Sequence, residues 1–365
     1  MKCYINEPLV ISVSVPNGNY EVTLTVKAHE DTVFSILSQS RRFIRNDVEI
    51  KNGESMDIVF NANVCDYHFD GGEFTEVKTL DVYILCDGAV TATAAVSPVD
   101  MPTIYIAGDS TVTDQPAEYP YEPTETFCGW GQALQSLLKP GIAVSNHAQS
   151  GSCTMAFIGT NWTAFKDKIK PGDVLVCEFG HNDQKVKELD AYGGYAERLR
   201  YFVEYARKKG AYPVLNSPIN RIIFEPDGTL RNLLGEYRNA VKSVAEEMNV
   251  PFIDMWQRTT EYFETAGPVK SWGFFRCKGE ERDYTHTNDV GGLMIAKFFA
   301  QEVIKNGVKP IADFVDESRL EVKQVFADPE DSFDNSEMRE HLKSIGLVNI
   351  PNGDIDADIT GLQIG

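Results

Sequence analysis

The sequence predicts a protein of two parts, an antiparallel β-sandwich followed by an α/β domain built on a parallel sheet. Residues 1–98 contain short runs rich in β-branched residues, separated by turn sequences such as Pro16-Asn17-Gly18 and Asn52-Gly53. That pattern is typical of an antiparallel sandwich. From Pro102 onward, short apolar runs alternate with segments of helical period, which indicates parallel strands covered by helices on both faces.

The individual elements follow from the same patterns. In the first part we expect strands at 9–15, 20–26, 56–60 and 80–85. In the second part we expect strands at 103–107, 141–146, 173–179, 211–216 and 250–253, and helices at 129–138, 192–209, 231–248 and 288–305. Pro98 and Pro102 mark the boundary, because proline ends a strand ladder or a helix. The predicted domains are a β-sandwich at 1–98, an α/β domain at 102–310 and a C-terminal extension at 311–365.

Charge and composition exclude several classes of protein. The 365 residues carry a net charge of -20, which argues against nucleic acid as a partner. Residues 311–365 hold thirteen Asp or Glu against four Lys or Arg, so we expect a solvated acidic extension. No apolar run is long enough to span a bilayer and the first residues do not resemble a secretory signal, so we expect no membrane partner and a cytoplasmic location. The sequence does not indicate an oligomeric state.

Cysteine usage and motif spacing predict neither a disulfide framework nor a cofactor. The seven cysteines are odd in number, form no Cys-x-x-Cys pair and lie mostly in apolar surroundings, which favours buried reduced thiols. No Cys/His cluster has the spacing of zinc ligands. Neither a phosphate-binding loop nor a dinucleotide-binding fingerprint is present. We therefore expect no metal and no cofactor.

Ser110 is a candidate nucleophile. The run Ile104-Tyr105-Ile106-Ala107 reads as a buried parallel strand, and Gly108-Asp109-Ser110 follows it as a small turn. In open α/β sheets the carboxyl edge of the strands is where ligands bind. A serine hydroxyl needs a base within hydrogen-bond reach to become nucleophilic. Taken alone, the turn could equally be a helix-capping serine.

Asp283-Tyr284-Thr285-His286 supplies the base and a group to orient it. His286 lies three residues after Asp283, close enough in a tight loop for the carboxylate to accept from one ring nitrogen while the other faces Ser110. Asn288 is placed to cap the helix that follows. Without a serine nearby, the segment would read as a polar loop before a helix.

Two further turns offer donors for an oxyanion. Gly151 follows the strand at 141–146, and a glycine there lets a backbone N–H approach a ligand closely. Asn182, in Gly180-His181-Asn182-Asp183, follows the strand at 173–179 with an amide side chain. Serine, glycine and asparagine thus follow three successive strands, and the carboxyl ends of parallel strands share one edge of the sheet. Acyl transfer requires such donors where negative charge develops.

These segments resemble the four sequence blocks of the SGNH, or GDSL-type, hydrolases. The strings Gly108-Asp-Ser-Thr-Val112, Gly129-Trp-Gly-Gln132, Phe179-Gly-His-Asn-Asp183 and Asp283-Tyr-Thr-His286 are similar to the rhamnogalacturonan acetylesterase branch. The resemblance covers residues 102–305. It implies a flavodoxin-like three-layer α/β/α fold and a serine esterase in which Ser110 attacks, His286 acts as base and then acid, and Asp283 orients His286. It also implies an oxyanion hole made by the Ser110 and Gly151 N–H groups and the Asn182 side chain.

The resemblance also bears on sugar recognition. Ser152 stands where that branch often carries an arginine, a departure that puts recognition of an anionic sugar in question. The N-terminal segment resembles carbohydrate-binding jelly rolls fused to such esterases, through Val15-Pro-Asn-Gly-Asn-Tyr-Glu-Val22; a structural or dimerising role is the alternative.

The substrate is less determined than the reaction. The predicted partner is an acetylated oligosaccharide of the rhamnogalacturonan or pectin type; acetylated xylan or another neutral sugar is the alternative, and a catalytically inactive carbohydrate-binding protein is an alternative of another class. The loop cations at 185, 187, 276, 278 and 282 form either a basic rim or solvated loop charge. Trp272 forms either a sugar-stacking wall or core packing. The candidate substrate contacts are His181, Trp272 and Arg282.

Overall fold

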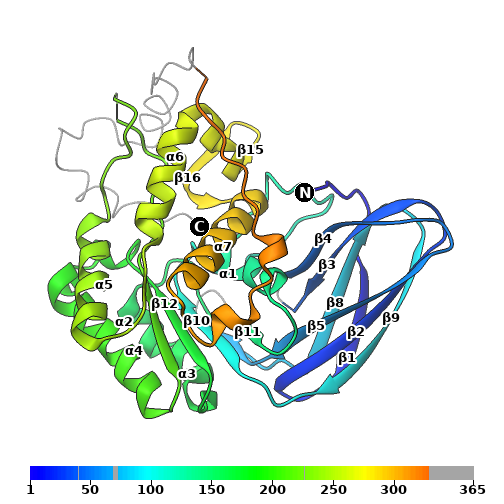
Figure 1. The fold of residues 1–365 in the computed structure, drawn as a ribbon, viewed down its shortest axis with the longest axis horizontal. Coiled ribbons are helices and arrows are strands. Elements are labelled where there is room, and N and C mark those ends of the chain that lie inside the picture. The colour runs from blue at the N-terminus through cyan, green and yellow to red at the C-terminus, as the bar shows by residue number, and fades with distance from the viewer. Residues whose placement is uncertain (40, 69–72, 226, 329–365) are drawn as a thin grey trace.

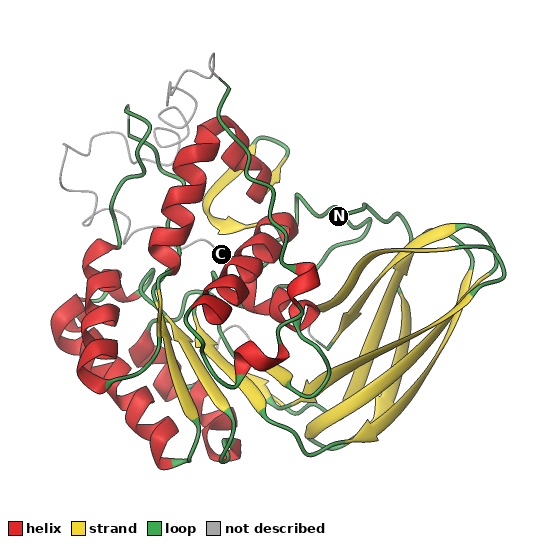
Figure 2. Ribbon diagram, viewed as in Figure 1, coloured by secondary structure: helices red, strands yellow, loops and turns green. Residues whose placement is uncertain are grey.

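A computed structural model describes residues 1–39, 41–68, 73–225 and 227–328 of the chain (Figure 1). Antiparallel strands form the N-terminal part, and a parallel sheet with helices on both faces forms the rest (Figure 2). Both parts of the predicted fold class are confirmed. Among the described residues, no helix is both long enough and apolar enough to cross a membrane, and no group of three His, Cys, Asp or Glu could hold a metal ion.

The N-terminal part is a sandwich of two antiparallel sheets, with strand orders β1-β8-β3-β4 and β5-β2-β9. Alternate residues of β2 point into the interior, where Val22, Leu24 and Val26 are fully buried. The bounds are β1 Leu9–Ser14, β2 Gly18–Ala28, β3 Thr32–Ser38, β4 Arg42–Ile50, β5 Ser55–Val64, β8 Thr79–Cys86 and β9 Val90–Pro98, with a small pair β6 Tyr67–His68 and β7 Phe74–Thr75.

Three strands of the two sheets, β3, β4 and β9, and the small pair β6 and β7 were not predicted from the sequence. Strand β4 contains Asn46 and Asp47, and β9 contains three alanines, residue types that are depleted in strands. Strand β3 is apolar, but it is joined to β4 by a turn that contains no glycine or proline. Tertiary pairing with β8 holds β3 in the sheet.

The second part is built on a five-stranded parallel sheet of order β11-β10-β12-β13-β14. The first strand of this part therefore lies between the second and the third, as in flavodoxin-like folds, where ligands bind at the carboxyl edge beside the reversal of strand order. All five predicted strands are present. Their bounds are β10 Thr103–Gly108, β11 Ala143–Asn146, β12 Val174–Glu178, β13 Tyr212–Asn216 and β14 Phe252–Ile253.

Helices cover both faces of this sheet (Figure 1). Ile104 and Ile106 of β10 face one apolar cluster, which includes α1, α6 and α7. Tyr105 and Ala107 face a second cluster, which includes α2 to α5. The bounds are α1 Trp130–Ala133, α2 Thr154–Gly159, α3 Asn161–Phe165, α4 Ala196–Lys208, α5 Gly235–Met248, α6 Met255–Ser271, α7 Asp289–Lys305 and α8 Ile311–Phe314; a hairpin of β15 Phe275–Lys278 and β16 Glu281–Thr287 precedes α7.

The beginning of the predicted acidic extension packs on the hydrolase domain instead of being solvated. Ile311 and Val315 are buried, and Leu138 and Val315 form an antiparallel bridge. The Tyr262 hydroxyl of α6 donates to the Lys323 carbonyl oxygen, 3.0 Å away. Apolar residues at 311, 315 and 320 cause this packing, because the negative charge is carried by the positions between and after them. The remainder of the extension, 329–365, lies outside the described residues.

The seven cysteines all lie in described parts of the chain and are free thiols. Four of them are buried, at 86, 128, 153 and 177, as the apolar surroundings predict; Cys3 is exposed, and Cys65 and Cys277 are half-buried. Burial raises the pKa of Cys177 above its ordinary value, so this thiol stays protonated in its strand.

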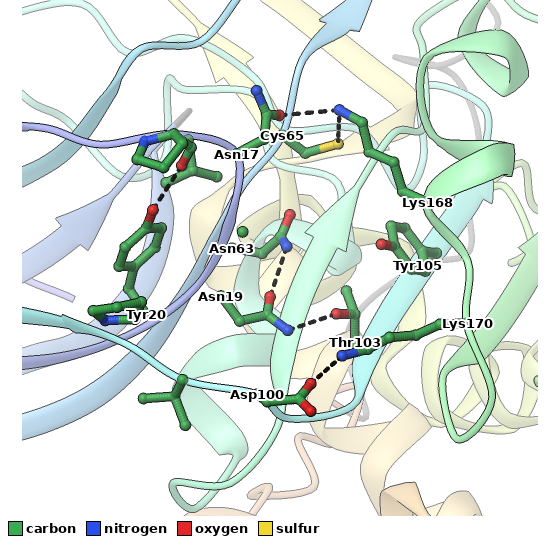
Figure 3. A pocket seen from close by; sticks show the side chains of 15 residues that line it. Asn17, Asn19, Tyr20, Asn63, Cys65, Asp100, Thr103, Tyr105, Lys168 and Lys170 are labelled. Carbon is green, nitrogen blue, oxygen red and sulfur yellow. Dashed lines mark hydrogen bonds and ion pairs between the residues drawn. The ribbon is translucent and has the colours of Figure 1, made fainter.

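The two parts share an apolar core and a polar seam. Tyr4, Leu37, Phe43 and Leu85 of the first part belong to the same buried cluster as α1 and α7. A cavity of about 520 Å³ lies in the seam, near the start of β10 and so at the sheet edge opposite Ser110 (Figure 3).

The polar side chains around this cavity bond mainly to one another. Asn63 donates to Asn19 at 2.7 Å, Asn19 donates to the Thr103 hydroxyl at 2.8 Å, and Lys168 donates to Asn17 at 3.0 Å (Figure 3). The last two of these bonds cross the boundary between the two parts, so the cavity belongs to their junction.

Candidate active site

Ser110 lies in a tight turn that directly follows β10. The Asp109 carbonyl oxygen accepts from the Val112 N–H at 3.1 Å and from the Thr113 hydroxyl at 2.8 Å. The buried Asp109 carboxylate accepts from the N–H of Thr111 at 3.0 Å. The turn is therefore fixed on both sides of Ser110, whose half-buried side chain is left at the carboxyl edge of the sheet.

Ser110, His286 and Asp283 form a continuous chain of hydrogen bonds. Ser110 Oγ lies 2.7 Å from His286 Nε2, and His286 Nδ1 lies 2.8 Å from Asp283 Oδ2. Burial opposes ionisation of Asp283, but interaction with His286 and hydrogen bonds from the His286 and Thr285 N–H groups outweigh it, and the pKa of Asp283 lies below its ordinary value. The ionised carboxylate accepts a hydrogen bond from Nδ1–H of His286. Nε2 then carries no proton and is the acceptor for the serine hydroxyl.

The hairpin and α7 together place His286. His286 lies in β16, which pairs antiparallel with β15. Asn288 caps α7, as predicted, by accepting from the Gly291 N–H at 2.9 Å, and its amide donates to the carbonyl oxygens of Gly273 and Phe275. One side chain thus ties the start of the helix to the hairpin that carries the base. The hairpin itself was expected only as a loop.

The predicted oxyanion groups meet on adjacent strand ends. Gly151 has φ +73, the region that favours glycine, and lies in an exposed turn after β11. The Gln149 N–H donates to the Gly108 carbonyl oxygen at 3.0 Å, so this turn lies against the turn of Ser110. Asn182, after β12, donates from its amide to the Ser152 carbonyl oxygen at 3.2 Å. The three strands are neighbours in the sheet.

Asn182 is held in one orientation. Its amide oxygen accepts from Lys185 Nζ at 3.1 Å, so its NH₂ group faces the Gly151 turn. One hydrogen of this NH₂ bonds to Ser152, and the other has no partner among the described residues. The arrangement supplies a free N–H donor beside the turn, which is what stabilisation of an oxyanion needs. The oxyanion roles of Ser110, Gly151 and Asn182 stay predictions.

The three predicted substrate contacts lie in different surroundings. His181 is buried and its Nε2 lies 3.1 Å from the Ile219 carbonyl oxygen; burial, with the nearby charges of Arg221 and His286, lowers its pKa well below the ordinary value. Trp272 is half-buried and packs against the main core cluster. Arg282 is exposed and donates to the carbonyl oxygens of Gly279 and Glu281. These positions favour packing roles for His181 and Trp272, and substrate contact stays a prediction for all three.

A layer of buried acids beneath the site was not found from the sequence. Glu178, at the end of β12, accepts from the Thr111 hydroxyl, the Trp130 indole and the Asn216 amide. Burial, followed by the charge of Asp109, raises its pKa well above the ordinary value. Burial also raises the pKa of Asp183 to about 7. A glutamate closing the apolar run Val174-Leu-Val-Cys-Glu178 was the available signal.

Arg41 of the β-sandwich reaches into the hydrolase domain. Its guanidinium donates to the carbonyl oxygens of Gln115 and Phe127, at 2.6 and 2.5 Å, and forms a buried ion pair with Asp289, the first residue of α7, at 2.8 Å. The Phe127 ring stands edge-on to the His286 ring, with centroids 5.8 Å apart. The Arg41 side chain therefore connects both ends of the loop 115–127 to the start of α7, the helix that follows His286.

Comparison with known proteins agrees with this geometry. The sequence profile of the GDSL-like Lipase/Acylhydrolase family matches residues 106–291, about half of the chain. Rhamnogalacturonan acetylesterase RhgT of Bacillus subtilis (strain 168) is 34% identical over 220 residues, which cover 58% of this chain and 92% of RhgT. Rhamnogalacturonan acetylesterase of Emericella nidulans is 26% identical over 230 residues, 56% of this chain and 86% of that protein.

A third relative extends the similarity beyond the hydrolase domain. The crystal structure of YxiM from Bacillus subtilis superposes with a TM-score of 0.55 at 25% identity, covering 82% of this chain and 81% of YxiM. In sequence, this uncharacterized esterase aligns over 314 residues, more than the hydrolase domain contains, so the alignment includes part of the sandwich. The profile match and the identity to RhgT show that the chain belongs to the GDSL-like lipase/acylhydrolase family.

Proposed function

We propose that the protein removes acetyl groups from plant cell-wall oligosaccharides of the rhamnogalacturonan type. Its family and its named relatives make it a carboxylic ester hydrolase. The observation that carries the mechanism is the chain of hydrogen bonds from Ser110 through His286 to Asp283, at 2.7 and 2.8 Å. The substrate class is supported by the names of RhgT and of YesY, a probable rhamnogalacturonan acetylesterase that this chain covers over 98% of its length.

The geometry supports a two-step acyl transfer. Ser110 Oγ attacks the acetyl carbonyl carbon while His286 Nε2 takes its proton, and the N–H donors of Gly151 and Asn182 stabilise the oxyanion. His286 then protonates the departing sugar oxygen, which leaves an acetyl ester on Ser110. Water, deprotonated by His286, releases acetate and restores the serine. Asp283 keeps the imidazole in the required tautomer through both steps.

The replacement Ser110→Ala tests the proposed nucleophile. We expect acetate release from acetylated rhamnogalacturonan oligosaccharides to fall by on the order of 10⁶-fold, because no other group takes the serine's place. A fluorophosphonate probe should label the wild-type protein at Ser110 and leave the variant unlabelled. Ser97→Ala, at an exposed position of β9, is the matched control and should retain full turnover.

Three results would contradict the proposal in different ways. Turnover retained in Ser110→Ala would remove the serine mechanism, because another group would then carry the reaction. A wild-type protein that the probe does not label and that releases no acetate would favour a binding protein without activity. Faster acetate release from acetylated xylan than from acetylated rhamnogalacturonan would keep the mechanism and replace the substrate by a neutral sugar.

A further inference from the structure

A pocket of about 160 Å³ lies beside the catalytic groups, between the loop 115–127 and the β15–β16 hairpin. Gln115 and Phe127 connect it to the site. Gln115 donates to the Ser150 hydroxyl at 2.9 Å, next to Gly151, and the Phe127 ring contacts the His286 ring edge-on. When an acetyl group of the substrate lies at Ser110, the sugar unit that carries it, or the adjoining unit, can therefore reach this pocket.

Arg276 is the fixed cation of this pocket. Its Nε donates to the Glu125 carbonyl oxygen at 3.1 Å, its Nη1 pairs with the Glu281 carboxylate at 2.5 Å, and its guanidinium lies over the Phe127 ring, 4.8 Å from the centroid. The side chain is only 16% exposed. Nη2 has no partner among the described residues. A guanidinium held in this way presents its remaining N–H donors in a fixed planar geometry, and this geometry is suited to binding a carboxylate.

Lys278 brings a second cation to the same pocket. It pairs with Glu118, and both side chains are well exposed, at 42% and 84%. Exposed ion pairs of this kind contribute little to stability, so a ligand carboxylate can replace Glu118 at small cost. The block-two turn contributes no cation, because Gly151 is followed by Ser152. Lys185, which donates to Asn182 at 3.1 Å, lies nearer the catalytic groups, whereas Arg276 and Lys278 of the hairpin are the cations that line this pocket.

We propose that this pocket binds the carboxylate of a uronic acid unit of the substrate, with Arg276 as the fixed anion-binding group and Lys278 as an exchangeable one. The inference rests on the proposed function and adds to it the part of the site that selects an acidic sugar. Screening over about 8 Å makes the groups at the pocket matter more than the net charge of -20. The lining includes Glu118, Glu122 and Glu125 as well as the two cations, so the proposal rests on the fixed geometry and unused donors of Arg276 and not on a positive local charge.

The test uses the full chain and two substrates, one with ionised and one with esterified carboxyl groups. These are acetylated rhamnogalacturonan oligosaccharides and the same oligosaccharides with their galacturonate carboxyl groups methyl-esterified. We expect Arg276→Gln to raise KM for the charged substrate about tenfold or more, to affect the methyl ester much less, and so to lower the selectivity ratio of kcat/KM. Arg276→Lys, which keeps the charge and loses the fork, should fall between, and Lys278→Gln should have a smaller effect.

The control is Arg200→Gln. Arg200 lies on α4 and pairs with Glu247, so this variant makes the same change in net charge on a helix that does not line the pocket, and the selectivity ratio should stay at the wild-type value. Equal loss on both substrates in Arg276→Gln would overturn the inference, because it would show that Arg276 acts only by supporting Phe127 and His286. A wild-type protein that the fluorophosphonate labels but that releases acetate from neither rhamnogalacturonan substrate would overturn the proposed substrate class and the pocket together, leaving the serine mechanism intact.

Discussion

Asp183 shows how much of the site depends on groups that solvent does not reach. It lies in the turn that carries Asn182, and one of its carboxylate oxygens accepts from the N–H and hydroxyl of Thr154, at 2.9 and 2.6 Å. The other oxygen has no partner among the described residues. Because burial raises the pKa of Asp183 to about 7, the folded protein keeps a proton on this carboxyl that the unfolded chain releases near pH 4.

We therefore expect Asp183→Asn to change how stability depends on pH. Between about pH 4 and 7 the folded wild-type protein binds one more proton than the unfolded chain, so its free energy of unfolding falls as pH rises, by on the order of 1 kcal/mol per pH unit from this group. The amide cannot ionise and lacks this contribution. Urea unfolding of both proteins across this range should show the variant gaining stability relative to wild type as pH increases.

Asp57→Asn is the control for this measurement. It makes the same substitution at an exposed position on β5, and its stability relative to wild type should not follow the same course with pH. A constant difference between Asp183→Asn and wild type over the whole range would show that Asp183 is already ionised at pH 5.

At this scale the sequence predicts the residues that carry the chemistry better than those that support them. Ser110, Asp283 and His286 stand in short motifs, and the structure brings them within hydrogen-bond distance across 176 residues of chain. Arg41 pairs with Asp289 across 248 residues, and nothing in either local sequence indicates the other. Phe127 likewise reads as an ordinary aromatic residue until the fold sets it against His286.

Among the elements, helix α6 is the largest that the sequence did not predict. It contains Thr259 and Thr260, which favour strands, and a kink at Gly267 (φ +72) followed by Pro268. These residues obscure the helical period. Tertiary packing stabilises the helix in spite of these residues, because Met255, Tyr262 and Phe263 fill the core on one face of the sheet. The α-helix predicted at 129–138 is shorter than expected, because the chain continues as a 3₁₀ helix at Leu134–Leu137.

The start of α7 shows why the elements around His286 tolerate little change. A Cβ at Gly291 would lie 1.9 Å from the Phe274 carbonyl oxygen, which is backbone at the start of the hairpin. We expect Gly291→Ala to lower the free energy of unfolding by about 2 kcal/mol. It should also lower kcat, because relief of the clash moves the hairpin that carries His286. Thermal unfolding and acetate release measure the two effects.

Gly159→Ala is the matched control for this variant. Gly159 ends α2, and a Cβ there meets no atom within 4 Å. The same substitution should therefore change stability by less than about 0.5 kcal/mol and leave turnover unaltered. If Gly291→Ala behaved like Gly159→Ala, the close contact between α7 and the hairpin would contribute neither to stability nor to the placement of His286.

In the whole molecule, the sandwich and the hydrolase domain are coupled through Arg41. Its ion pair with Asp289 is almost completely buried, with side-chain exposures of 7% and 0%. Burial raises the pKa of Asp289, and Arg41 and Tyr121 oppose that rise. The aspartate therefore depends on a cation supplied by the other domain.

We expect Arg41→Met to cost about 3 to 5 kcal/mol, because it leaves Asp289 buried without its counterion. The cost should be smaller at pH 5 than at pH 8, since the unpaired carboxyl then takes up a proton more readily in the folded state, and stability falls as pH rises. The double variant Arg41→Met with Asp289→Asn should recover part of the loss. Chemical denaturation of the four proteins of this cycle gives the coupling energy.

Additive effects of the two substitutions would show that the pair does not couple the domains. The sequence alone predicts the two parts and their order, but it treats them as separate modules. Their shared core and the Arg41 contact depend on residues that become neighbours only after both parts have folded.

The reach of Arg41 has a practical consequence for protein engineering. A gene trimmed at the proline-marked boundary would encode a hydrolase in which Asp289, at the start of the helix that follows His286, is buried without its counterion, and in which the loop 115–127 beside Ser110 has lost its contacts with Arg41. Fusion enzymes built from this scaffold should therefore retain the β3–β4 turn as part of the catalytic unit, or first neutralise position 289.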